Sequence, residues 1–261
     1  MAKSKGSSIV KAGAEGTALA KLEDWEVEAQ ASARAEKAKE VLGIPRITHK
    51  GSIIKIDDKP VKGNALRHVV VDYIFSKAYY TKEYDPNGPP QTPVCYAYGR
   101  EEAGMAPHAE ASKKQHDQCG GCPHNKFNTA EKGRGKRCKD ERKVAAIVEL
   151  TKPTDIAKAE VRQYSVPPGS LRNWGNYLSS LNEVTPTGDV RSVLTELGAQ
   201  PMDTGAYSLN FTAIEKLTKE FHKAVLARKA GMEAQMFAPW PQITEDEAPA
   251  GKTKKVKGQG K

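Results

Sequence analysis

The feature of this 261-residue chain that points most directly to chemistry is a pair of cysteines separated by two glycines. Cys119 and Cys122 form a CxxC pair, which one tight turn can present to a single tetrahedral metal ion. The intervening glycines let the backbone bend so that amide N–H groups can point at the sulfurs. Cys95 and Cys138 are the other two cysteines, and together the four predict one structural Zn²⁺ bound by four thiolates.

Other interpretations of the cysteines stay open at this point. A redox CxxC is disfavoured because a thioredoxin-like pair begins a helix after a strand, whereas glycine, proline and charged residues flank this one. Buried thiols without a metal are a further possibility. A deaminase would place His-x-Glu before Pro-Cys-x-x-Cys, but here His108 and Glu110 precede a CxxC whose neighbouring proline, Pro123, follows it. Three histidines of the same segment could also replace Cys95 as a ligand: His108, His116 and His124.

The densest basic stretch of the predicted folded part covers residues 132–139 and includes Cys138. Its glycines let a polyanion approach the backbone, and its lysines and arginines supply positive charge. The GxxxxGK[ST] spacing of a P-loop is absent. A solvated loop without a partner is the alternative to a nucleic-acid contact. The residues predicted to contact phosphates here are Lys132, Arg134, Lys136, Arg137 and Lys139.

Tyrosines near this stretch suggest a second kind of contact with nucleic acid. Tyrosines beside basic residues on a strand can stack on bases of any sequence. Most strand aromatics belong to a core, and Trp174 is expected there, but a group at one strand end is expected to be exposed. The predicted contact residues of this group, with one further arginine, are Arg67, Lys77, Tyr79, Tyr80, Lys82 and Tyr84. The next candidates for stacking on bases are Tyr73, Tyr96 and Phe127.

The composition favours a polyanionic partner and excludes a membrane-spanning helix. The chain has 41 Lys and Arg against 32 Asp and Glu, which gives a formal net charge of +9 and a pI of about 9.2. No run approaches the roughly 18 apolar residues of a transmembrane helix. The basic N-terminal sequence lacks the apolar region of a signal peptide, so a cytoplasmic location without membrane contact is predicted.

Pattern changes along the chain predict three parts. Residues 1–44 are expected to form a flexible N-terminus and a helical arm, because residues 17–42 are rich in Ala, Glu and Lys. Residues 45–238 are expected to form the core, with a zinc-binding insertion at about 95–142. Residues 239–261 are rich in Pro, Gly and Lys and are expected to be a disordered tail.

The core pattern is mainly β (α+β). Residues 66–75 are partly apolar on both faces, which is typical of a central strand. A helix is expected to start near Ser170, and a last helix to be capped by Thr212 with Glu215 and to end at Gly231. The other expected strands cover residues 53–56, 94–98, 144–150, 161–166, 189–197 and 206–211. The count favours an OB-like β-barrel with an N-terminal and a C-terminal helix, although a mixed α+β sheet fits almost as well.

Several motifs within residues 45–215 add a family resemblance. They cover residues 79–80, 84–86, 93–97, 105–108, 119–127 and 133–139. Together they resemble phage single-stranded-DNA-binding proteins that have an OB-like core and a Cys-rich zinc insertion. The resemblance implies that Cys95, Cys119, Cys122 and Cys138 hold zinc. It also implies sequence-independent DNA binding in replication or recombination, with replication or recombination proteins as partners.

Departures and alternatives limit that expectation. Such replication proteins often end in an acidic tail, whereas this chain has only Glu245, Asp246 and Glu247 before it turns basic. A zinc-containing adaptor or regulator that docks another protein is the main alternative. A zinc-dependent nucleic-acid enzyme is disfavoured because no DxD, HNH-like or paired-carboxylate cluster stands out in the expected strands.

Overall fold

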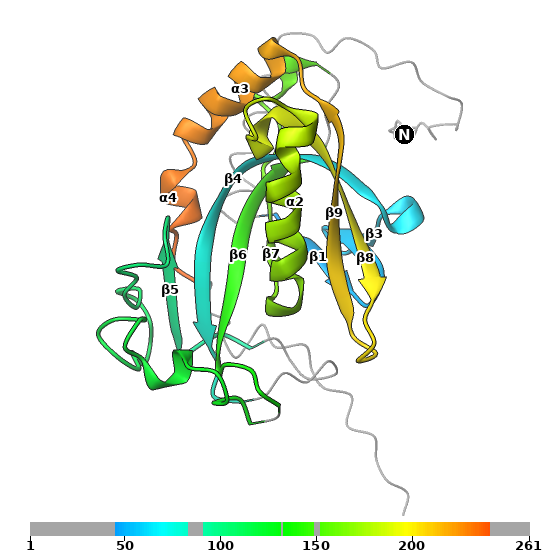
Figure 1. Cartoon of the computed structure of the whole chain (residues 1–261). Helices are drawn as coiled ribbons and strands as arrows, with labels where there is room; N and C mark the ends of the chain where they lie inside the picture. The colour runs from blue at the N-terminus through cyan, green and yellow to red at the C-terminus, as the bar shows by residue number, and fades with distance from the viewer. Residues whose placement is uncertain (1–44, 83–90, 132, 149–151, 241–261) are drawn as a thin grey trace, which may run out of the picture. The chain divides into compact units, whose positions relative to one another are not determined.

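The computed structural model describes residues 45–82, 91–131, 133–148 and 152–240 (Figure 1). The expected N-terminal helix and nearly all of the Lys-rich tail lie outside these residues, as do Tyr84 and Lys132. None of the helices in the described segments has the length and apolar character needed to cross a bilayer.

The described chain is mainly β, with two antiparallel sheets and few helices, as the pattern predicted. The small sheet has the order β1-β2-β3, and the large sheet has the order β7-β6-β4-β8-β9 with β5 also paired to β4. Pairing among the described strands ends at β7 and at β9, so these residues form no closed barrel. The strands are β1 (Ile47–Lys50), β2 (Ile53–Ile56), β3 (Lys59–Pro60), β4 (Leu66–Tyr79), β5 (Cys95–Gly99), β6 (Cys138–Ile147), β7 (Arg162–Val166), β8 (Val193–Pro201) and β9 (Tyr207–Lys216).

The predicted central strand is confirmed as β4, to which β5, β6 and β8 all pair. β5 pairs with residues 75–79 of β4, whereas β8 pairs with residues 66–68. Between these two segments, the carbonyl of Val71 accepts a hydrogen bond from Arg191 and the carbonyl of Tyr73 accepts one from Arg100. Two arginines therefore bind the part of the β4 edge that lies between β5 and β8.

Each face of the large sheet carries its own apolar core, because successive side chains of a strand point to opposite faces. On one face, α2 (Leu171–Val184) packs Trp174 and Leu181 against a cluster that includes Val70 and Val144. On the other, α3 (Lys219–Ala230) and α4 (Glu233–Met236) contribute to the cluster around Ile74. The predicted start of α2 after Ser170 and the core position of Trp174 are both confirmed. Short 3₁₀ turns cover Lys62–Asn64, Pro123–Asn125, Pro153–Asp155, Pro168–Ser170 and Val190–Ser192.

The predicted cap of the last helix was wrong. Thr212 and Glu215 belong to β9, where pairing with β8 continues to Lys216. The helix begins at Lys219 instead, after Thr218, whose hydroxyl accepts a hydrogen bond from a backbone N–H of the first turn. A Thr-x-x-Glu pattern alone did not mark the helix start because ladder hydrogen bonds to β8 extended the strand through it. The predicted end at Gly231 is confirmed.

The start of the strand expected at residues 144–150 was also misplaced. β6 begins at Cys138, so residues 138–142, which were assigned to the insertion, are part of the sheet. Apart from the buried Cys138, their side chains are charged and half-buried, which hid the strand from a search for apolar runs. The long segment between β5 and β6 consequently covers residues 100–137.

Candidate functional site

The four cysteines come together at one end of the large sheet. Tyr79 of β4 pairs with Cys95 of β5 on one side and with Cys138 of β6 on the other. Directly paired residues point to the same face of a sheet, so these three side chains share a face. Cys119 and Cys122 reach the same place from the loop, and all four buried thiols line a cavity of about 20 Å³.

Backbone hydrogen bonds shape the CxxC turn and hold it in place. The N–H of Cys119 donates to Met105 O at 2.8 Å, and the N–H of Cys122 donates to Cys119 O at 3.3 Å. Asn125 follows the turn and donates from Nδ2 to Cys119 O at 2.8 Å. A Cβ at Gly121 would lie 2.9 Å from the His116 ring, so a side chain at this position would require that ring to move.

The chemistry of this donor set suits a soft divalent cation. All four cysteines are free thiols. Burial, together with a smaller effect of the neighbouring thiols, raises the pKa of Cys119 to about 11 and that of Cys138 to about 12. Thiols of this kind stay neutral at neutral pH unless a bound cation favours the thiolate.

The ligand geometry itself is not formed. Within the described segments, no group of three Cys, His, Asp or Glu side chains is arranged to hold a metal ion. The shared cavity shows that the four thiols converge, while zinc binding stays a prediction. Of the three histidines considered as ligands, His116 and His124 line the same cavity, whereas His108 stacks on Tyr96 with ring centroids 5.0 Å apart.

Lys77, which was predicted to contact nucleic acid, is buried beneath the loop with only 5% of its side chain exposed. Its ammonium forms an ion pair with Asp140 and lies 3.4 Å from Asn125 Oδ1. Lys136 donates to the same two side chains, at 2.6 Å and 3.3 Å. Although burial alone would raise it, hydrogen bonds from Lys136 and Lys77 hold the pKa of Asp140 below its ordinary value. These four residues, called the lysine network below, tie the CxxC loop to the sheet.

Of the predicted tyrosine platform, the two described members, Tyr79 and Tyr80, are not exposed. Tyr79 is half-buried, with the His124 ring 4.5 Å away and the Arg137 guanidinium 5.8 Å away. Tyr80 is also half-buried, and burial raises the pKa of its hydroxyl. Phe127 is the exposed aromatic of this region instead: 70% of it is accessible, and the Lys136 ammonium lies 5.1 Å from its ring centroid.

The remaining predicted nucleic-acid contacts are spread over different environments. Arg134 and Lys82 are exposed. Arg137 pairs with Glu131 and donates to Thr81 O, and Lys139 donates to Lys136 O at 3.0 Å. Arg67 is 64% exposed and pairs with Glu196 on β8, away from the cysteines in sequence and in strand position. The basic stretch is therefore partly fastened by its own ion pairs, with Arg134 as its exposed cation.

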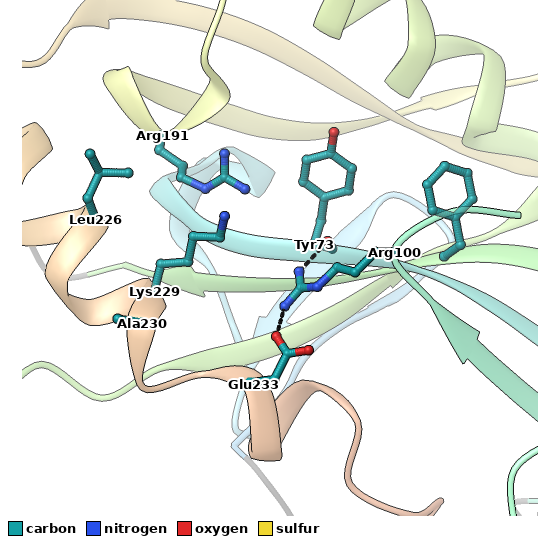
Figure 2. Close-up of a pocket in the computed structure, with 8 residues that line it drawn as sticks. Tyr73, Arg100, Arg191, Leu226, Lys229, Ala230 and Glu233 are labelled. Carbon is teal, nitrogen blue, oxygen red and sulfur yellow. Dashed lines mark hydrogen bonds and ion pairs between the residues drawn. The ribbon is translucent and has the colours of Figure 1, made fainter.

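The structure also brings together residues that the sequence did not single out. A hollow of about 530 Å³ is lined by residues of β4, η5, α3 and α4 and by Arg100, which follows β5 (Figure 2). Its cationic side chains are Arg100, Arg191 and Lys229. They lie in unrelated parts of the sequence, so no local spacing could have indicated them.

Comparisons of the chain with protein-family models, with curated proteins and with solved structures gave no match. The functional argument therefore depends on the geometry of the chain's own residues.

Proposed function

We propose that this protein binds and protects single-stranded DNA without reading its sequence, in the cytoplasm, during phage DNA replication or recombination. The observation that carries the proposal is Phe127, a 70% exposed ring with the Lys136 ammonium 5.1 Å from its centroid. Arg134, also exposed, lies in the same loop segment. An exposed ring next to cations offers stacking and phosphate contacts at once, as binding to single strands requires.

The charge of the whole chain supports the same partner. A formal net charge of +9 attracts a polyanion over long range and raises its rate of association. Because every base has a π-face, stacking on a phenylalanine does not depend on sequence. Binding through Phe127 and Arg134 would therefore be general for single strands.

A structural zinc ion belongs to the proposal. Cys95, Cys119, Cys122 and Cys138 would hold it, and its chemistry would be to cross-link four thiolates. The chain's own residues orient the loop: Asn125 binds the Cys119 carbonyl, and the lysine network fastens the loop to β4 and β6. Phe127 is thereby presented on a fixed support rather than on a free loop.

The OB-like core is part of the same proposal. It is supported by the long central strand β4, which pairs with β6 along most of its length and with β8 at its beginning. Such sharing of one strand is what a partly open five-stranded barrel needs.

The test is a fluorescence titration with single-stranded and double-stranded oligonucleotides of several sequences at two salt concentrations. We expect salt-sensitive, stoichiometric binding that prefers single strands and is indifferent to sequence. Phe127→Ala should weaken binding at both salt concentrations, with about 1–3 kcal/mol lost per stacked base. Ile53→Ala is the matched control, because Ile53 is also an exposed apolar residue, 42% accessible, on the small sheet.

Two outcomes would contradict the proposal. If the parent and Phe127→Ala bound single strands with equal affinity, Phe127 would have no role in binding, and the proposal would lose its main support. A parent protein that binds no oligonucleotide but captures one specific protein would favour the adaptor function instead.

A further inference from the structure

The hollow between the sheet and the C-terminal helices has an unusual supply of fixed cationic groups. Arg191 donates from Nε to Val71 O at 3.2 Å and from its two terminal nitrogens to Asp72 at 3.4 Å and to Asp189 at 3.0 Å. Arg100 donates to Asp72 at 2.7 Å and to Tyr73 O at 3.4 Å. The buried carboxylate of Asp72 and the free edge of β4 therefore hold both guanidinium groups before any ligand arrives.

A third cation, Lys229 of α3, has no ion-pair partner among the described residues. Figure 2 shows its ammonium and the Arg191 guanidinium pointing into the same hollow. Asp72 and Asp189 already pair with Arg191, whereas Lys229 keeps an unpaired charge that an anion entering the hollow would meet. Lys229 thus offers a charge to an anion beside guanidinium groups that are already held in place.

Among the described residues that line the hollow, Glu233 is the one carboxylate, and it lies beside Arg100. Glu233 pairs with Arg100 but is 66% exposed, so it can leave at little cost when another anion takes its place. The hollow has about 530 Å³, within the size range of small-ligand sites. The fork of an arginine guanidinium matches two oxygens of a phosphate group, which a monoatomic anion does not offer.

We propose that this hollow is a phosphate-binding site, formed by Lys229, Arg191 and Arg100, with Glu233 as the side chain that the phosphate displaces. The phosphate belongs either to a bound DNA strand or to a free nucleotide. The first source depends on the proposed function, and the second does not.

The experiment compares the full-length parent with Lys229→Ala, Glu233→Gln and Lys223→Ala. Lys223 is an exposed lysine of the same helix that does not line the hollow, so its replacement removes the same charge elsewhere. Binding of a labelled oligothymidylate is measured over a series of salt concentrations. Binding of thymidine monophosphate and of inorganic phosphate is measured by NMR titration and by the shift in melting temperature.

If a DNA phosphate binds here, Lys229→Ala weakens oligothymidylate binding about tenfold at low salt, the size of one charge-assisted contact. It also lowers the slope of log affinity against log salt by about 0.7, and Lys223→Ala changes both less. Glu233→Gln strengthens binding, since it removes the competing carboxylate.

If a free nucleotide is the ligand, Lys229→Ala abolishes the response to thymidine monophosphate and phosphate and leaves oligothymidylate binding unchanged. If the parent protein binds the nucleotide but no DNA, the proposed function is refuted and the proposed phosphate site is supported. The site is refuted if Lys229→Ala and Glu233→Gln, folded as the parent is, match Lys223→Ala in every titration.

Discussion

The helix-covered part of the large sheet and its cysteine-bearing end are held together in different ways. Under α2, α3 and α4, two clusters of buried apolar side chains fill both faces of the sheet. At the cysteine end, the buried apolar cluster shrinks to Ala97, Met105 and Cys119, with Phe75 packed against it. Thiols and the lysine network supply the other contacts there.

This difference separates the stability of the two regions. Apolar burial acts through the whole sheet, because each strand contributes to a shared core. The loop of residues 100–137 rests on a few specific ties, and regions of this kind open in local steps below the free energy of global unfolding. Changes in the core should therefore alter global stability, and changes at the cysteine end should alter local order.

The largest expected effect is that of Trp174→Ala in the core under α2. Trp174 is 2% exposed, and its ring packs edge-on against Tyr73 at 5.4 Å and Phe211 at 5.0 Å. The variant should lose about 3–5 kcal/mol of unfolding free energy, measured by denaturant titration. Tyr207→Ala on β9, a 39% exposed aromatic, is the control and should change stability by less than about 1 kcal/mol. Similar losses in both variants would contradict a core role for Trp174.

A second prediction concerns two titratable groups on opposite faces of the helix-covered sheet. Burial lowers the pKa of His68, bonded to Tyr164, from 6.5 to about 4. The unfolded chain then binds more protons between pH 4 and 6.5, so this group costs stability as the pH falls through that window. The full loss is about 3 kcal/mol.

Glu141 changes the stability with pH in the opposite direction to His68. Burial raises the pKa of Glu141 from 4.5 to about 7, against a hydrogen bond from Ser165. The folded chain binds more protons between pH 4.5 and 7, so this group costs stability as the pH rises through that window. The two slopes oppose each other between pH 4.5 and 6.5.

Glu141→Gln should uncover the contribution of His68. Its unfolding free energy should rise with pH between 4.5 and 6.5 more steeply than that of the parent, and the difference between the two curves isolates Glu141. Denaturant titrations at half-unit pH steps measure it. A difference curve that is flat over this window would show that Glu141 has an ordinary pKa in the folded protein.

The sequence predicted those features that depend on local pattern. β4 was recognised because both of its faces are partly apolar, and α2 because Leu171, Trp174, Leu178 and Leu181 share one helical face. The cysteine convergence followed from the chemistry that four thiols have in common. Lys77 was misjudged because its partner Asp140 lies 63 residues away, and strand pairing alone brings the two together.

The cations of the hollow could not be predicted from the sequence for a similar reason. Arg100, Arg191 and Lys229 meet because none of the described strands pairs with β4 between β5 and β8, at the edge that the arginines bind. That gap is a property of the sheet register and not of any motif. Residues that act together across such a gap become visible only in the folded chain.

The smallest expected effect on global stability is that of Cys119→Ser at the cysteine end. The change removes one thiol from the shared cavity and from the small apolar cluster around it. Amide hydrogen exchange should show lost protection in residues 100–137, while β4, β6 and α2 keep theirs. The global unfolding free energy should change by less than about 1 kcal/mol, because neither large core includes this residue.

Metal analysis sharpens this last comparison. The parent should contain about one zinc per chain, and chelation should reproduce the exchange pattern of Cys119→Ser. Lys114→Ser, a change at an exposed residue of the same loop, should leave both exchange and metal content as in the parent. If Cys119→Ser instead lowered global stability as much as Trp174→Ala, the cysteine end and the helix-covered sheet would form one cooperative unit. The different ways in which they are held would then not separate their unfolding.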